Sequence, residues 1–118
     1  MRAMRGLFAL SLGLTISGAA WADQNPILTE DHLIKSTTPG IELFVRNKHP
    51  TTLSEWTPDR TLLFIHGATY PAETSFDLPI EGSSMMDMFA RAGFDVFLVD
   101  VRGYGRSTRP PEIWSSSG

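Results

Sequence analysis

Two short apolar runs with a helical pattern between them are the feature that most constrains the fold of this chain. The runs are residues 61–65 and 94–99, which are rich in Leu, Ile, Val and Phe and do not alternate with polar residues. Strands that are buried on both faces of a sheet have this composition. Apolar residues recur between them at the i, i+3, i+4 and i+7 positions of a helix face: Met85, Met88, Phe89 and Ala92. The pattern predicts a strand, a helix of about ten residues and a second strand parallel to the first.

Local signals at both ends of the predicted helix agree with its position. Ser83 or Ser84 can cap the first turn, and Gly93 follows the last apolar residue. We expect the apolar face to lie against the sheet, with Met86 as a further core residue. Ligands of open α/β sheets bind beyond the carboxyl ends of the strands, so ligand-binding or catalytic residues are expected in the segments that begin at His66 and Asp100.

Each of these two segments carries a motif. The first is His66-Gly67-Ala68-Thr69, in which the glycine permits a sharp turn that leaves backbone amides free to face a ligand. The second, residues 100–107, reads D-x-R-G-x-G-x-S. The order strand, HG, helix, strand, D-x-R-G-x-G-x-S closely resembles the amino-terminal part of α/β-hydrolases, over residues 41–114. The fold class expected is α/β: an incomplete α/β-hydrolase sheet in which an antiparallel hairpin precedes a parallel βαβ unit.

The hairpin is predicted from residues 31–35 and 41–46, which flank the turn formers Thr37-Thr38-Pro39-Gly40. The second of these strands alternates apolar and polar residues, which predicts one wetter face. Residues 48–60 are predicted to be a polar loop, in which Trp56 is a packing residue. Residues 112–118 are predicted to be loose.

The resemblance implies that this chain holds one of two oxyanion donors. In α/β-hydrolases a backbone N–H just after the HG pair binds the oxyanion, which makes Ala68 the candidate and Thr69 the second choice. The alternative is that Gly67 merely turns the chain. Tyr70 and Phe76, in the long loop before the helix, are candidates for lining a substrate pocket, and plain packing is the alternative.

The remaining motif residues are expected to have structural roles: His66, Gly67, Asp100, Arg102, Gly103, Gly105 and Ser107. Asp100 is expected to pair with a neighbouring arginine, for which Arg102 is the nearest candidate, or with loop amides. Ser107 is not expected to be a nucleophile, because Arg109 replaces the second glycine of a G-x-S-x-G elbow. Thr108 likewise replaces the third glycine of a dinucleotide fingerprint.

No cofactor or metal is expected, because His32 and His49 lack partners at ligand spacing. The chain has no cysteine, which excludes disulfides and a cysteine nucleophile. Its net charge is −3, and the sequence has no basic patch that would indicate binding to nucleic acid. Residues 1–22 have the pattern of a secretory signal peptide: Arg2 and Arg5, an apolar run, and Ala20-Trp21-Ala22. We therefore expect a periplasmic or secreted partial hydrolase domain at 23–118, without a stable membrane span after cleavage. The alternative is an uncleaved anchor.

The expected function follows from the resemblance. The chain has 118 residues, whereas folds of this kind commonly need about 200–250 residues, so it is expected to be a fragment. The parent is expected to hydrolyse an ester or related bond of a small molecule through a nucleophile-His-acid triad beyond residue 118, and the fragment alone is expected to be inactive. The alternatives are a noncatalytic binding protein, an inactive remnant, or a nucleotide-binding βαβ domain.

Overall fold

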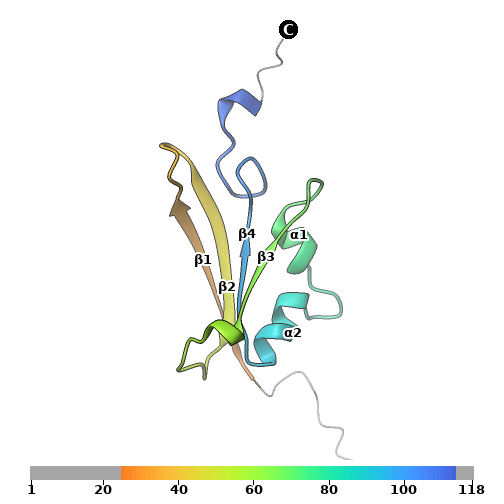
Figure 1. The fold of residues 1–118 in the computed structure, drawn as a ribbon. Coiled ribbons are helices and arrows are strands. Elements are labelled where there is room, and N and C mark those ends of the chain that lie inside the picture. The colour runs from red at the N-terminus through yellow and green to blue at the C-terminus, as the bar shows by residue number, and fades with distance from the viewer. Residues whose placement is uncertain (1–24, 114–118) are drawn as a thin grey trace, which may run out of the picture.

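The computed structural model describes residues 25–113, which form one four-stranded mixed sheet and two short helices (Figure 1). The strand order is β1-β2-β4-β3. The elements are β1 (Ile27–Lys35), β2 (Glu42–Pro50), β3 (Thr61–Ile65), α1 (Ala72–Phe76), α2 (Met85–Arg91) and β4 (Asp95–Val99), with 3-10 turns η1 (Pro58–Arg60) and η2 (Pro111–Ile113). The predicted signal peptide, residues 1–22, lies outside the described residues. Within residues 25–113 no helix is long and apolar enough to span a membrane.

The predicted βαβ unit is confirmed. Strand β3 pairs in parallel with β4, from Thr61 opposite Asp95 to Ile65 opposite Val99, and α2 lies between them in the chain. Ser84 caps α2 through a reciprocal capping box, in which its hydroxyl accepts from the Asp87 amide and the Asp87 carboxylate accepts from the Ser84 amide.

The face of α2 that packs on the sheet differs in part from the predicted one. Met86 and Ala90 are fully buried, whereas Met85 and Met88 are 47% and 67% exposed and Ala92 is also exposed. Ala90 lies in the hydrophobic core, and Asp87 forms an ion pair with Lys48 of the strand beneath the helix. The prediction is thus correct for Met86 and for Phe89, whose ring contacts those of Phe64 and Phe94, and wrong for Met85, Met88 and Ala92.

The predicted hairpin is confirmed but is longer than expected. β1 and β2 are antiparallel from Ile27 opposite Pro50 to Lys35 opposite Glu42, so β2 extends four residues past Arg46. Residues 48–50 are thus buried strand instead of loop. The face of β2 expected to be wetter lies under the helices, where Arg46 and Lys48 are paired with carboxylates. Helix α1 and turn η2 also lie in segments that were expected to lack regular structure.

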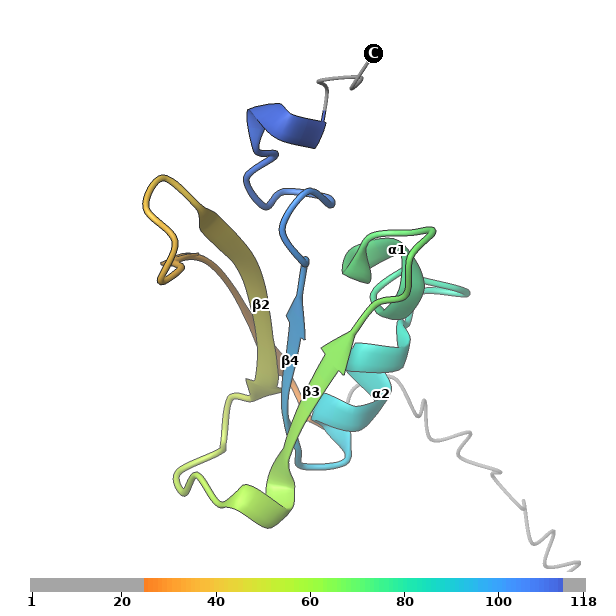
Figure 2. The same cartoon turned by 45° about the horizontal axis from the view of Figure 1, so that its top comes forward.

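The hydrophobic core lies between the sheet and the two helices, which lie together on one side of it (Figure 2). Its buried members are Phe44, Ala72, Met86, Ala90, Val96 and Leu98. On the other face of β3, Leu63 and Ile65 are 58% and 59% exposed. This face of β3 is therefore open among the described residues, whereas the same face of β2 is buried at Val45, Asn47 and His49.

Candidate functional site

Two loops lie side by side where β3 and β4 end, at the upper edge of the sheet in Figure 1. His66 joins them, because its Nε2 accepts a hydrogen bond from the Val101 amide at 2.9 Å. Tyr104 joins them a second time: its hydroxyl donates to the Ala68 carbonyl oxygen at 2.6 Å. The two rings also contact each other, with centroids 4.6 Å apart. One imidazole and one phenol thus hold the HG turn against the second motif.

The contacts of His66 determine its tautomer. Nε2 accepts from an amide, so the ring proton of the neutral imidazole is on Nδ1. Nδ1 lies 2.6 Å from the Gly67 carbonyl oxygen and donates to it. Both ring nitrogens are therefore engaged with backbone groups, and the side chain is buried. His66 has the contacts of a structural hydrogen-bonding residue.

Asp100 is the buried centre of the second motif. Its carboxylate accepts from two backbone amides, that of Ala72 at 2.8 Å and that of Arg106 at 2.9 Å, and the residue is 1% exposed. Loop amides, one of the two expected kinds of partner, thus occupy both oxygens, and the alternative pairing with Arg102 is not formed. Gly105 is required here because its φ is +48° and because a Cβ would overlap the carboxylate.

Ser107 and Thr108 attach the end of this loop to β2. The Ser107 hydroxyl donates to the Asp100 carbonyl oxygen at 2.6 Å and accepts from the Phe44 amide at 2.8 Å. The Thr108 hydroxyl accepts from the Glu42 amide at 2.9 Å. The loop therefore continues the hydrogen bonding of the sheet past the end of β4, and the Ser107 hydroxyl is fully engaged in it.

The backbone amides of Ala68 and Thr69 are the free donors of the HG turn. Both residues are exposed, and within residues 25–113 neither amide has a hydrogen-bond acceptor. Tyr70, which follows them, is 62% exposed. Phe76 instead packs in the core, where its ring stacks on that of Phe64 with centroids 4.7 Å apart. Of the two candidate pocket residues, Tyr70 is the one that lies at the open edge.

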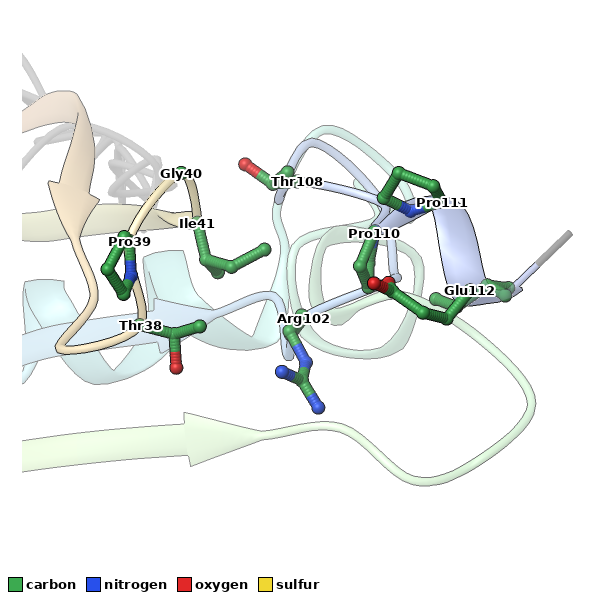
Figure 3. A pocket seen from close by; sticks show the side chains of 10 residues that line it. Thr38, Pro39, Gly40, Ile41, Arg102, Thr108, Pro110, Pro111 and Glu112 are labelled. Carbon is green, nitrogen blue, oxygen red and sulfur yellow. The ribbon is translucent and has the colours of Figure 1, made fainter. Parts of the chain in front are cut away.

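A cavity of about 710 Å³ lies beside this site, between the β1–β2 turn at residues 38–41 and the segment at residues 110–113. Figure 3 shows Arg102 between these two segments. Tyr70 and Phe76 do not line the cavity. Arg102, the candidate arginine partner of Asp100, thus lines this cavity instead. No group of three or more His, Asp or Glu side chains among residues 25–113 is arranged to hold a metal ion.

A network of charged side chains lies beneath α1 and α2, and it was not predicted from the sequence. Asp77 is at its centre, with a side chain 1% exposed that contacts Arg46 at 2.8 Å and Lys48 at 2.6 Å. Arg46 also pairs with Asp31 at 2.7 Å, and Lys48 with Asp87 at 2.7 Å. Alternating charges along β2 were a signal for it, but their partners are 15 to 39 residues away.

Protonation in this network follows from its pairing. The hydrogen bond from Arg46 lowers the pKa of Asp31 below 3.8. Burial acts to raise the pKa of Asp87, but hydrogen bonds from Lys48 and from the Ser84 amide outweigh it and lower that pKa. The hydrogen bond to Asp31 raises the pKa of Arg46. Asp31, Asp87 and Arg46 are therefore ionised at neutral pH.

Comparison with known proteins bears on the fold of the chain. A family model described as alpha/beta hydrolase fold matches residues 60–117, which include both motifs. No curated protein matches the chain. The family match and the strand order β1-β2-β4-β3 together identify the described residues as the amino-terminal part of an α/β-hydrolase fold.

Proposed function

We propose that this chain supplies one oxyanion donor of a hydrolase that cleaves an ester or a related bond in a small molecule. The supporting observation is that the exposed amides of Ala68 and Thr69, at the carboxyl end of β3, have no acceptor within residues 25–113. Acyl transfer builds negative charge on the carbonyl oxygen, and backbone donors that are already oriented stabilise that charge without reorganisation. Ala68 is the first candidate donor and Thr69 the second.

In this proposal the nucleophile, the histidine base and its acid lie beyond residue 118. A nucleophile on a strand-to-helix turn attacks the substrate carbonyl, the histidine takes its proton, and the resulting oxyanion binds the Ala68 N–H and one later amide. Neither His66 nor Ser107 has a place in this triad, because backbone groups occupy both ring nitrogens of His66 and the hydroxyl of Ser107.

The test uses the gene product that carries this chain and a chromogenic short-chain ester. Ala68→Pro deletes the N–H, whereas the matched control Ala68→Gly keeps it. The proline variant should lose about 10²–10³-fold in kcat with little change in KM, since one oxyanion donor contributes that much. Equal activity of the two variants would remove Ala68 from the oxyanion site. No turnover and no labelling by a fluorophosphonate probe would favour a noncatalytic or inactive protein.

We further propose that the protein is exported, from the leader pattern at residues 1–22. Amino-terminal sequencing of the protein recovered from its producing cells should begin at Asp23. A chain that still begins at Met1 would support the uncleaved anchor instead.

A further inference from the structure

We propose that His66 and Tyr104 are positioning residues, which aim the two candidate oxyanion amides by holding the carbonyl groups of the same peptide units. The catalytic part of this inference rests on the proposed hydrolase function. The orientation of the amides can be tested without that function.

The argument begins with the planar peptide unit. A trans peptide joins the C=O of one residue to the N–H of the next, and the two groups point in opposite directions. The Gly67 carbonyl, which accepts from His66 Nδ1 at 2.6 Å, shares its peptide unit with the Ala68 N–H. The Ala68 carbonyl, which accepts from the Tyr104 hydroxyl at 2.6 Å, shares its unit with the Thr69 N–H. Each candidate donor therefore has its own side-chain anchor.

The two anchors are themselves fixed. His66 Nε2 accepts from the Val101 amide, which sets both the ring orientation and the tautomer that donates to Gly67. The Tyr104 ring packs on the His66 ring with centroids 4.6 Å apart. Because both carbonyls are held by these anchors, both N–H groups point away from them, toward the side on which no described residue accepts.

This arrangement has two consequences for an oxyanion site. A fixed peptide plane needs no reorganisation when negative charge forms on the substrate, and reorganisation is the main cost that such sites avoid. A hydrogen bond at the carbonyl also polarises the peptide unit, which strengthens donation by its N–H.

The glycines beside Tyr104 explain how its hydroxyl reaches the other loop. Gly103 and Gly105 have φ of +91° and +48°, so the chain turns sharply on both sides of the tyrosine. The Tyr104 amide also donates to the Val101 carbonyl at 2.9 Å, which closes the turn. At the far end of the HG loop, Asp100 holds the Ala72 amide. The second motif therefore fixes the HG loop at both ends.

The decisive variant is Tyr104→Phe, which removes the hydroxyl and keeps the ring on His66. The other tyrosine of the chain, Tyr70, is exposed in the HG loop next to Thr69, so Tyr70→Phe is the matched control. Backbone amide resonances of Ala68 and Thr69 are measured in the gene product that carries this chain, with selective ¹⁵N labelling. Tyr104→Phe should shift the Thr69 amide and lower its order parameter while Ala68 changes little, and Tyr70→Phe should leave both amides unchanged.

A second variant, His66→Gln, tests the other anchor. Its side-chain oxygen can still accept from Val101, but it has no donor at the position of Nδ1, so the Ala68 amide should shift and Thr69 should not. An unchanged Thr69 amide in Tyr104→Phe would overturn the inference. Loss of the dispersed spectrum in that variant would overturn it too, because it would assign the hydroxyl to folding.

Turnover of the ester substrate supplies the catalytic readout. His66→Gln, which loosens the amide of the first-choice donor Ala68, should lower kcat about tenfold at unchanged KM. This loss is smaller than the roughly 10²–10³-fold expected for deleting that donor, because the amide is loosened and not removed. A shifted Ala68 amide with unchanged kcat in His66→Gln would overturn the catalytic part of the inference. If no variant and no parent protein turns over ester, the proposed function fails, while the amide resonances still decide whether the two side chains position the loop.

Discussion

Replacing Asp100 with asparagine is expected to destabilise the folded protein by about 3 kcal/mol. The carboxylate is 1% exposed and accepts from the amides of Ala72 and Arg106 at 2.8 and 2.9 Å. Asparagine has one acceptor oxygen, so its NH₂ group must face the second amide, donor against donor. The variant loses one hydrogen bond to a charged group, about 1.5–3 kcal/mol, and leaves a buried amide unsatisfied at a further cost of about 1–3 kcal/mol. The smaller desolvation cost of a neutral side chain offsets part of this loss.

The assay is denaturant unfolding of the gene product that carries this chain. A lower midpoint at unchanged m-value would report lost stability without a change in the unfolded surface. Asp59→Asn is the matched control, because Asp59 is exposed in η1 and its substitution should change the unfolding free energy by less than about 0.5 kcal/mol. If Asp100→Asn were as mild as this control, the carboxylate would not be the anchor that joins the two loops.

Two further predictions concern the charged network. Asp77→Ala should lower the unfolding free energy by about 2–3 kcal/mol. This is less than the roughly 3–5 kcal/mol for a wholly unpaired buried ion, because Arg46 keeps Asp31 as a partner and Lys48 keeps Asp87. A loss under about 0.5 kcal/mol would contradict this prediction. The folded pKa values of Asp31 and Asp87 lie below their ordinary 3.8, so these carboxylates contribute stability that is complete above that pH and is lost as the pH falls through the folded values. The melting temperature should therefore drop below about pH 4, less steeply in Asp31→Asn; a flat profile there would refute the assignment.

Elements with a local physical signature could be predicted from the sequence. β3 and β4 are continuous apolar runs, Ser84 forms the capping box, and the turn at residues 37–40 separates the hairpin strands. Each of these signals depends on residues within a few positions of one another. The position of the HG turn at a strand end follows from the same local information.

Features that depend on distant partners could not be predicted in this way. Lys48 and His49 were predicted to be loop because they are polar, and Asn47 was left outside the predicted strand, yet all three are buried strand residues. Asn47 donates to Asp95, and Lys48 pairs with Asp77, contacts that span 48 and 29 residues. Apolar periodicity likewise detects a stripe on a helix without saying which element covers it, which is why Met85, Met88 and Ala92 were wrongly assigned to the core face of α2.

The register of two strands connects this sheet to the proposed site. Ile65 pairs with Val99, so His66 and Asp100 leave the sheet side by side, and the His66 ring can reach the Val101 amide. A slip of one residue would turn His66 to the opposite face, because side chains alternate along a strand. The Gly67 carbonyl would then lose its donor, and the Ala68 amide would lose its direction. The apolar pairing of β3 with β4 thus sets the geometry of the HG turn, although none of these strand side chains lies in the turn itself.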